Sequence, residues 1–234
     1  MGTDEIIRTE LGLLTWVAVT APEKPSRLER RKQRTRAALI GAAQTFIAAG
    51  KLNAPVLEIT QAADVGMGSF YNHFDSKEQL FDAAVAEALD AHGALMDRLT
   101  DDLEDPAEVF ARSFRLTGRL FRRRPQESQI MLANGLQLLA SDRGLAPRAR
   151  RDIEAGARAG RFLVDDPDLA LAVAAGALMG LGRLLRDQPD RDDAAAADKV
   201  TEDVLRMLGM DSAEATEICR RPLPDLDASL LSPM

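Results

Sequence analysis

The sequence predicts an all-α protein of about nine helices, and three observations support this fold class. Ala (38 residues) and Leu (32) are strong helix formers and far outnumber Ile and Val (18 together), which favour strands. Apolar residues recur at helical spacing along most of the chain. The length of 234 residues is sufficient for a hydrophobic core that needs no disulfide bonds.

The N-terminal part of the chain, residues 27–81, contains three helical patterns, of which the second and third are short, and the start of a long fourth one. The expected helices cover residues 30–49, 56–63, 67–74 and 77–105. Gly50 is a natural left-handed stop for the first of them. Ser76 followed by Gln79 forms a capping box, which opens the long helix.

The rest of the chain predicts five further helices, separated by clusters of Pro, Gly and Asp. They are expected over residues 106–123, 126–140, 147–159, 167–187 and 193–209. The predicted domain division is an N-terminal extension (1–26), the three-helix unit (27–81), a second helical domain (82–210) and a C-terminal tail (211–234). Three interpretations stay open for the apolar segment 11–19: an ordered arm, a contact with a partner, or a misplaced translation start.

Cysteine and histidine are too scarce for a structural zinc site. The single cysteine, Cys219, cannot form an internal disulfide bond, and only His73 and His92 could supply imidazole ligands. We therefore expect no metal, no cofactor and a cytoplasmic protein. The apolar segment near the N-terminus is too short to span a bilayer and lacks the basic start of a secretory signal, so we expect no membrane contact.

Charge is distributed unevenly along the chain. The formal net charge is −7 overall, but residues 23–77 carry +4 and residues 78–234 carry −9. A basic module joined to an acidic one is expected when the first contacts a polyanion such as DNA. A basic arm precedes the short helices, and we expect its Arg34 and Arg36 to contact the DNA backbone.

Two short helices joined by a three-residue turn are typical of a helix-turn-helix unit. On the second of these helices, Phe70 and Phe74 are four residues apart and should anchor it to Phe46 and Ile59. The opposite side carries small and hydrogen-bonding residues, which suit DNA bases and phosphates. Lys77 opens the next helix, where unpaired backbone N–H groups also favour a phosphate. The expected DNA contacts are Met67, Gly68, Ser69, Tyr71, Asn72, His73 and Lys77.

Residues 33–81 resemble the DNA-binding domain of the tetracycline-repressor (TetR) family. The residues that carry the resemblance are Phe46, Gly50, Ile59, Ala63, Val65 and the run Gly68-Ser69-Phe70-Tyr71-Asn72-His73-Phe74 with Ser76-Lys77-Glu78. The Tyr-x-His-Phe-x-Ser-Lys core is far more specific than any glycine or charge motif. The resemblance implies that Ser69, Tyr71, His73 and Lys77 touch DNA.

Two departures from the family pattern bear on this implication. Asp64 stands where the family usually has a turn glycine, and we expect the turn to survive because aspartate tolerates a left-handed backbone better than most residues. Ala54 and Pro55 replace threonines that often hold a phosphate in the family. That anchor is either missing or supplied by Asn53 or the backbone.

The resemblance further implies that residues 82–210 bind a small-molecule effector, still unidentified, and join two subunits as a homodimer. The helix predicted over 167–187 is apolar on two faces, so both must be buried. Its small-residue face could meet a second subunit in a four-helix bundle with the helix 193–209. The expected dimer residues are Gly176, Gly180, Leu184, Val204 and Leu208. The expected lining of the effector cavity is Phe110, Phe114, Met131, Leu132 and Leu178.

Together these features predict a sequence-specific DNA-binding transcription regulator, a repressor that an effector releases from a palindromic operator. A helical enzyme is one alternative, but the sequence contains no paired nucleophile and base, no phosphate-binding glycine loop and no metal-ligand set. We therefore expect no enzyme activity. A non-specific DNA-binding protein is the other alternative, and it would require basic charge throughout, whereas the larger domain is acidic.

Overall fold

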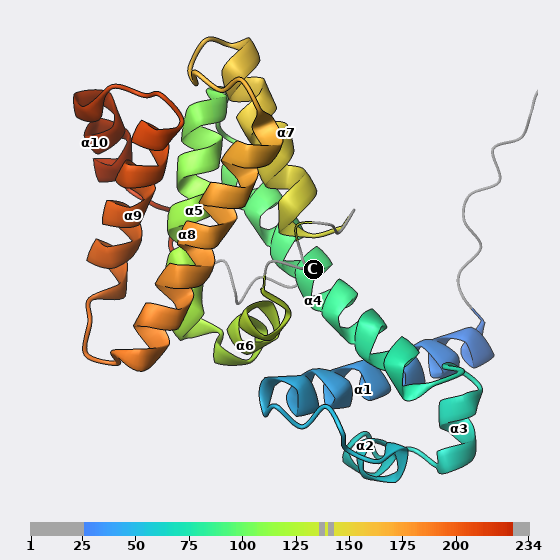
Figure 1. The fold of residues 1–234 in the computed structure, drawn as a ribbon. Coiled ribbons are helices and arrows are strands. Elements are labelled where there is room, and N and C mark those ends of the chain that lie inside the picture. The colour runs from blue at the N-terminus through green and yellow to red at the C-terminus, as the bar shows by residue number, and fades with distance from the viewer. Residues whose placement is uncertain (1–25, 136–138, 140–142, 227–234) are drawn as a thin grey trace, which may run out of the picture.

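The computed structural model describes residues 26–135, 139 and 143–226, and all ten regular elements in these residues are α-helices. A small head and a larger body are joined by the long α4 helix, which runs from one to the other (Figure 1). The all-α prediction is confirmed, with one helix more than the nine expected. The predicted extension, residues 1–26, lies outside the described residues except for Ser26.

The head consists of α1 (Arg27–Ala48), α2 (Val56–Ala62), α3 (Met67–Tyr71) and the start of α4 (Lys77–Thr100). α1 begins three residues before its predicted start because Ser26 and Glu29 form a capping box. The Ser26 hydroxyl accepts from the Glu29 N–H at 3.2 Å, and the Glu29 carboxylate accepts from the Ser26 N–H at 2.6 Å. Gly50, at φ +70°, follows the end of α1 as predicted.

The turn between α2 and α3 has the expected left-handed backbone. Asp64 has a φ of +52°, the one positive value at a non-glycine residue in the described part of the chain. α3 ends at Tyr71, three residues early, because the N–H groups of His73 and Phe74 both bond to the carbonyl of Phe70 and close the helix. Asn53 does not cap α2, whose N-cap is Pro55 without a side-chain hydrogen bond.

Aromatic and aliphatic side chains fill the core of the head. Ile59 and Phe70 are fully buried and Phe74 is nearly so, with Phe46 partly buried against them, as predicted. The same cluster contains Ile130 of α6, which belongs to the body and is fully buried here. The core of the head is therefore completed by a residue from the second domain.

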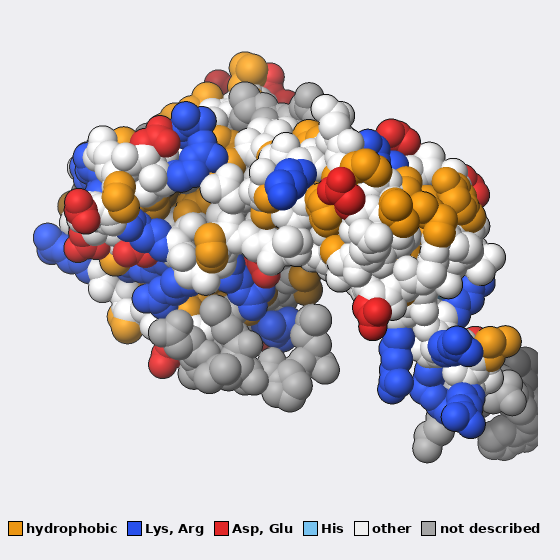
Figure 2. All heavy atoms as spheres, turned by 90° about the horizontal axis from the view of Figure 1, so that it is seen from below, with side chains coloured by type: hydrophobic (Ala, Val, Ile, Leu, Met, Phe, Trp, Pro, Cys, Tyr) orange, Lys and Arg blue, Asp and Glu red, His pale blue; other side chains and the backbone are white. Residues whose placement is uncertain are grey.

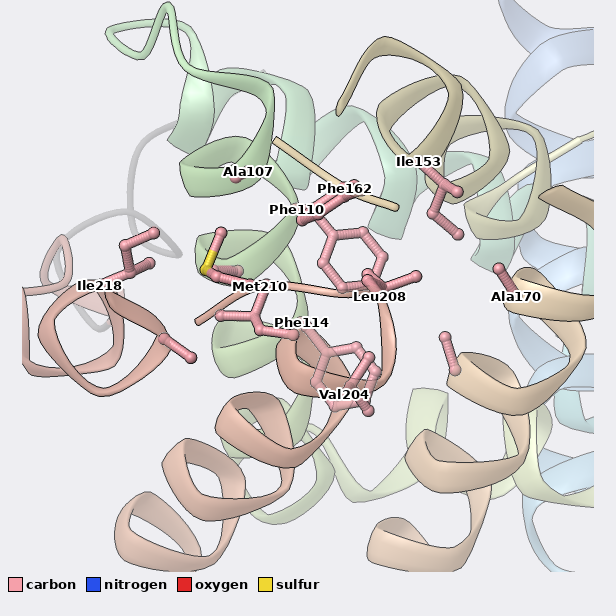
Figure 3. Packing of buried hydrophobic residues seen from close by; sticks show 14 of the residues in the cluster. Ala107, Phe110, Phe114, Ile153, Phe162, Ala170, Val204, Leu208, Met210 and Ile218 are labelled. Atoms are coloured by element: carbon pink, nitrogen blue, oxygen red, sulfur yellow. The ribbon is translucent and has the colours of Figure 1, made fainter. Parts of the chain in front are cut away.

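The body contains six helices. They are α5 (Pro106–Arg123), α6 (Pro125–Asn134), α7 (Leu145–Arg158), α8 (Pro167–Asp187), α9 (Asp193–Met207) and α10 (Ser212–Arg220). Phe110 and Phe114 of α5 lie at the centre of the main cluster, where α9, the neighbouring loops and the C-terminal helix converge on them (Figure 3). Phe162 meets Phe110 edge-on with ring centroids 6.0 Å apart.

Three expectations for the body were wrong. α6 ends at Asn134 instead of residue 140, because Gly135 takes a positive φ of +53° and stops it. α7 begins at Leu145 rather than 147. The segment expected to be a tail contains α10, which Asp211 caps by accepting from the N–H groups of residues 213 and 214, and Leu226 beyond it is 2% exposed.

α4 has no break at the predicted domain boundary between residues 81 and 82. Its first turn begins with the Ser76 cap, whose hydroxyl accepts from the Gln79 N–H at 3.1 Å. The Gln79 side chain accepts from Asp75, not from Ser76, so only half of the predicted capping box forms. One continuous helix thus connects the head to the centre of the body.

Candidate DNA interface, ligand cavity and subunit interface

α3 presents a continuous exposed face beside its buried anchor. Phe70 is 0% exposed, whereas Tyr71 is 61% exposed and meets the Phe70 ring edge-on at 5.0 Å. Met67, Gly68 and Asn72 are also exposed, and Ser69 and His73 are half-buried. A Cβ atom added at Gly68 would meet nothing within 4 Å. This face is therefore free to enter a groove of DNA, and the predicted contact residues between Met67 and His73 are exposed or half-buried on α3 or in the turn that follows it.

His73 lies between α3 and the basic arm. Partial burial, together with the nearby charges of Lys32 and Arg36, lowers the pKa of His73 below its usual value of 6.5. The imidazole is therefore neutral at pH 7, and it can both donate and accept one hydrogen bond.

The basic arm covers the first turns of α1. Arg34 is exposed there, in a run that also includes Arg27, Arg30, Arg31 and Lys32. Figure 2 shows Lys and Arg side chains gathered at the projecting end of the molecule, at the lower right. Arg36 differs from this run, because its guanidinium lies 5.4 Å from the Phe74 ring centroid and 3.6 Å from the Glu87 carboxylate. Arg36 therefore braces α1 against α4, in addition to its predicted DNA contact.

Lys77 is the first residue of α4, and its ammonium lies 5.9 Å from the Phe81 ring centroid. Lys77→Ala is expected to weaken binding to every DNA sequence, because the contact predicted for Lys77 is to a phosphate and not to a base. The slope of log affinity against log salt should fall by about one unit in a filter-binding or anisotropy series.

Lys199→Ala is a matched control for Lys77→Ala. Lys199 lies on α9 in the body and is paired with Glu202 and Asp203. The control should leave both the affinity and the salt slope unchanged. A Lys77 variant with the parental slope would remove Lys77 from the DNA interface.

An apolar chamber lies between α4, α5, α6, α7 and α8. Its volume is about 80 Å³, and its lining includes Leu89, Phe110, Phe114, Met131, Leu145, Ala149, Leu171, Ala174 and Leu178. Four of the five residues predicted for the effector cavity therefore line one chamber. The fifth, Leu132, borders a separate hollow between α5, α6 and α8, so its side chain does not reach this chamber.

A second chamber of about 60 Å³ adjoins the apolar one, and we call it the polar chamber because charged and hydroxyl side chains contribute to its lining, although most of its surface is apolar. The two share a wall of Phe110, Phe114, Leu145, Ala149 and Leu178. The polar chamber adds charged and hydroxyl groups from α4, α5 and α7, namely Asp97, Thr100, Ser113, Thr117, Arg148, Arg151 and Asp152. The two chambers share this wall, and we call them together the cavity, with the apolar chamber as its apolar end and the polar chamber as its polar end.

Ion pairs join α4 to α7 at the polar end of the cavity. Arg148 Nε donates to Asp97 Oδ2 at 2.7 Å, and Arg151 Nη2 lies 3.5 Å from Asp97 Oδ1. Arg151 Nε also donates to Asp152 Oδ1 at 2.9 Å. Burial raises the pKa of the Asp152 carboxyl above its usual value of 3.8. Two guanidinium groups and two carboxylates therefore neutralise each other at this end.

A buried polar pair lies behind the polar chamber. His92 of α4 is 2% exposed, and its Nε2 is 3.0 Å from the Thr117 hydroxyl on α5. Burial lowers the pKa of His92 to about 4, so the ring is neutral at pH 7. In the described part of the chain, no group of three or more His, Cys, Asp or Glu residues is placed to hold a metal ion.

One face of α8 is apolar and exposed. Leu169 and Val173 are 66% and 53% exposed, Leu184 is 36% exposed, and Gly176 and Gly180 lie between them without neighbours within 4 Å of an added Cβ. Of the described helices, α8 is long and apolar enough to cross a membrane, yet residues on its other side belong to the body core. We call Leu169, Val173, Gly176, Gly180 and Leu184 the outer face of α8.

Two residues predicted at the subunit interface are buried inside a single subunit. Val204 is 4% exposed and Leu208 is 0% exposed, and both belong to the main core cluster around Phe110. Figure 3 shows both side chains pointing inward toward Phe114 and Phe110. The prediction for these two residues was wrong because the apolar face of α9 packs on α5 of its own chain.

Comparisons with known proteins agree with this arrangement. Residues 39–84 match the family described as bacterial regulatory proteins, tetR family, and residues 105–221 match the tetracyclin repressor-like, C-terminal domain. A comparison with curated proteins finds no match.

Solved structures extend the comparison to most of the chain. The structure of RolR in complex with its ligand resorcinol is 35% identical, covers 84% of this chain and 98% of its own, and has a TM-score of 0.60. The structure of RolR without ligand is 37% identical, covers 81% of this chain and 98% of its own, and has a TM-score of 0.65. A regulatory protein in the tetR family from Rhodococcus RHA1 is 22% identical, covers 76% of this chain and 98% of its own, and has a TM-score of 0.57. At this identity the similarity supports the fold alone.

Sequence similarity, fold and the exposed recognition helix therefore lead to one assignment. The chain belongs to the tetracycline-repressor family of DNA-binding transcription regulators, whose members bind operator DNA, respond to small molecules and act as dimers.

Proposed function

We propose that this protein is a cytoplasmic homodimeric repressor that releases a palindromic operator when a small neutral aromatic molecule enters the cavity between α4, α5, α7 and α8. The observation that carries the proposal is the cavity itself, in which the phenylalanine-walled chamber shares a wall with one that charged and hydroxyl side chains help to line. Resorcinol, the ligand in the RolR structure, has an apolar aromatic ring that suits the first chamber and two hydroxyl groups that suit the second. We propose that the ligand of this protein is likewise a small hydroxylated aromatic molecule.

The volume of the cavity limits the size of the ligand. A cavity volume of about 10–15 Å³ holds one water molecule. The apolar chamber, at about 80 Å³, therefore suits a molecule with a single aromatic ring. Phe110 and Phe114 supply aromatic surface for such a ring, and their centroids are 6.0 Å apart.

The charges of the polar chamber favour a neutral ligand. Arg148 and Arg151 each contact a carboxylate of the protein, Asp97 or Asp152. A carboxylated ligand that took Arg151 from Asp152, whose side chain is 9% exposed, would leave a buried carboxylate without its partner, which is costly. A hydroxyl group can donate to Asp152 or Asp97 and accept from an arginine without breaking the pair.

The cavity is joined to the DNA-binding head through two helices. Leu89 of α4 and Met131 of α6 line the apolar chamber, whereas Ala88 and Ile130, their immediate neighbours, belong to the core of the head. A ligand that moves α4 or α6 must therefore move the head. Release of DNA follows if the ligand binds more tightly to the conformation in which the two heads are wrongly spaced for the operator.

Titration with resorcinol tests the proposal. Footprinting first defines the protected palindrome in the neighbouring promoter region, and calorimetry then measures resorcinol binding to free and to operator-bound protein. We expect tighter binding to free protein, displacement of operator and no binding of benzoate. Equal affinity for free and operator-bound protein, or no protected palindrome at moderate salt, would overturn the proposed function.

Tyr71→Ala tests the recognition helix. The variant should lose about 1–3 kcal/mol of operator binding in an electrophoretic shift or anisotropy assay, because the exposed ring contacts a base or a tightly held phosphate. The helical content by circular dichroism should be unchanged, since Phe70 still anchors α3.

Random DNA provides the comparison for Tyr71→Ala. Its binding is expected to change much less than operator binding. An equal loss on both would indicate that Tyr71 contributes no sequence specificity. Equal affinity of the parent protein for operator and random DNA would instead favour non-specific DNA coating.

A further inference from the structure

We propose that Gly93 of α4 is a positioning residue for the effector site: the space left by its missing side chain holds the guanidinium of Arg148 beside the polar chamber. The inference rests on the proposed function, in which that chamber takes the hydroxyl groups of the ligand. Gly93 is buried in the middle of a 24-residue helix, where glycine costs stability relative to alanine. A glycine at such a place is expected where neighbouring atoms leave no room for a side chain.

The surroundings of Gly93 supply that reason. A Cβ atom built on Gly93 would lie 2.5 Å from Nη1 and 2.7 Å from Cζ of Arg148, well inside contact distance. Other packed glycines, such as Gly118, Gly156 and Gly182, face alanine, leucine or phenylalanine side chains. Among the described glycines, Gly93 is the one whose added Cβ would meet a charged side chain.

The position of Arg148 is defined on two further sides. Its Nε donates to Asp97 Oδ2 at 2.7 Å, and its Nη1 donates to the carbonyl of Gly144 at 2.8 Å. Asp97 is one turn of α4 beyond Gly93, so a single face of α4 supplies both the space and the counter-charge. Arg148 is thereby held across the α4–α7 contact while it lines the polar chamber.

Alanine at position 93 would act on the ligand site without unfolding the protein. The atoms it would meet are the far end of a flexible side chain, which can move without a shift of the backbone. Alanine also favours the helix more than glycine does. A glycine needed only for tight helix packing would behave in the opposite way, because its replacement would lower the melting temperature.

Gly93→Ala is therefore compared with Gly41→Ala. Gly41 is an α1 glycine with nothing within 4 Å of an added Cβ. For Gly93→Ala we expect the Kd for resorcinol to rise about tenfold, the effect of losing one charge-assisted hydrogen bond, with no fall in Tm. Gly41→Ala should leave the Kd unchanged.

A second measurement does not depend on the ligand. The NMR signal of the Arg148 Nε–H group, identified by its loss in Arg148→Ala, should shift or broaden in Gly93→Ala and remain in Gly41→Ala. If the parent protein binds no resorcinol, the proposed ligand class fails, while this signal still decides the role of Gly93. An unchanged signal in Gly93→Ala would overturn the inference.

A double-mutant cycle separates positioning from packing. Where Gly93 acts through Arg148, Gly93→Ala should cause no further loss of resorcinol affinity in an Arg148→Ala background. If the two losses add, or if Gly93→Ala lowers Tm without changing the Kd, Gly93 has a packing role only.

Discussion

Val173→Asp is expected to convert the protein into a monomer and to lower operator affinity by at least about 100-fold, because two linked heads bind a palindrome far more tightly than one. Val173 is 53% exposed at the centre of the outer face of α8, between Leu169 and Gly176. In a twofold interface the same surface meets itself, so the substitution would place two carboxylates close together in an apolar contact.

The experiment combines sedimentation or light scattering with an operator shift assay. Leu163→Asp is the matched control, since Leu163 is 79% exposed but lies in the α7–α8 loop, outside the outer face of α8. The control should remain dimeric and keep the parental operator affinity. A dimeric Val173→Asp protein would show that a different surface joins the subunits.

Helical spacing locates apolar faces but does not show which chain covers them. Leu184 of α8 and Leu208, just beyond α9, were both predicted at the subunit interface from the same kind of pattern. The structure leaves Leu184 36% exposed and buries Leu208 completely in its own subunit. The difference arises from tertiary packing of α9 on α5, and that packing depends on contacts between residues far apart in sequence.

The two ends of the cavity differed in how far the sequence could predict them. Phe110, Phe114 and Leu178 were predicted because large apolar residues recur at helical spacing. Asp97 and Arg148 were missed, since they are 51 residues apart and each resembles an ordinary surface charge on its own helix. They form an ion pair because α4 and α7 lie side by side in the fold, and the local spacing of residues does not predict that arrangement.

The head was predicted more completely because its signals are local. The turn chemistry at Asp64, the Phe70 and Phe74 spacing and the Ser76 cap each act within a few residues. The contribution of Ile130 was not predicted, since it reaches the head from α6, far along the chain.

Ile130→Ala is expected to destabilise the protein by about 2–5 kcal/mol and to weaken the coupling between effector and operator. Ile130 is 0% exposed in the core of the head, so truncation removes buried methyl groups and leaves a cavity between α6 and the head. Met131, the next residue, lines the apolar chamber. The substitution should therefore weaken the contact between α6 and the head without changing the residues that line the apolar chamber.

Ile153→Ala gives a control of equal size, because Ile153 is also 0% exposed but belongs to the core of the body. Both variants should lose similar free energy of unfolding in urea. Coupling is measured as the ratio of effector Kd values for operator-bound and free protein, and it should fall toward one only in Ile130→Ala. A parental ratio in Ile130→Ala would mean that α4 alone carries the ligand signal, since α6 would then contact the head without transmitting force to it.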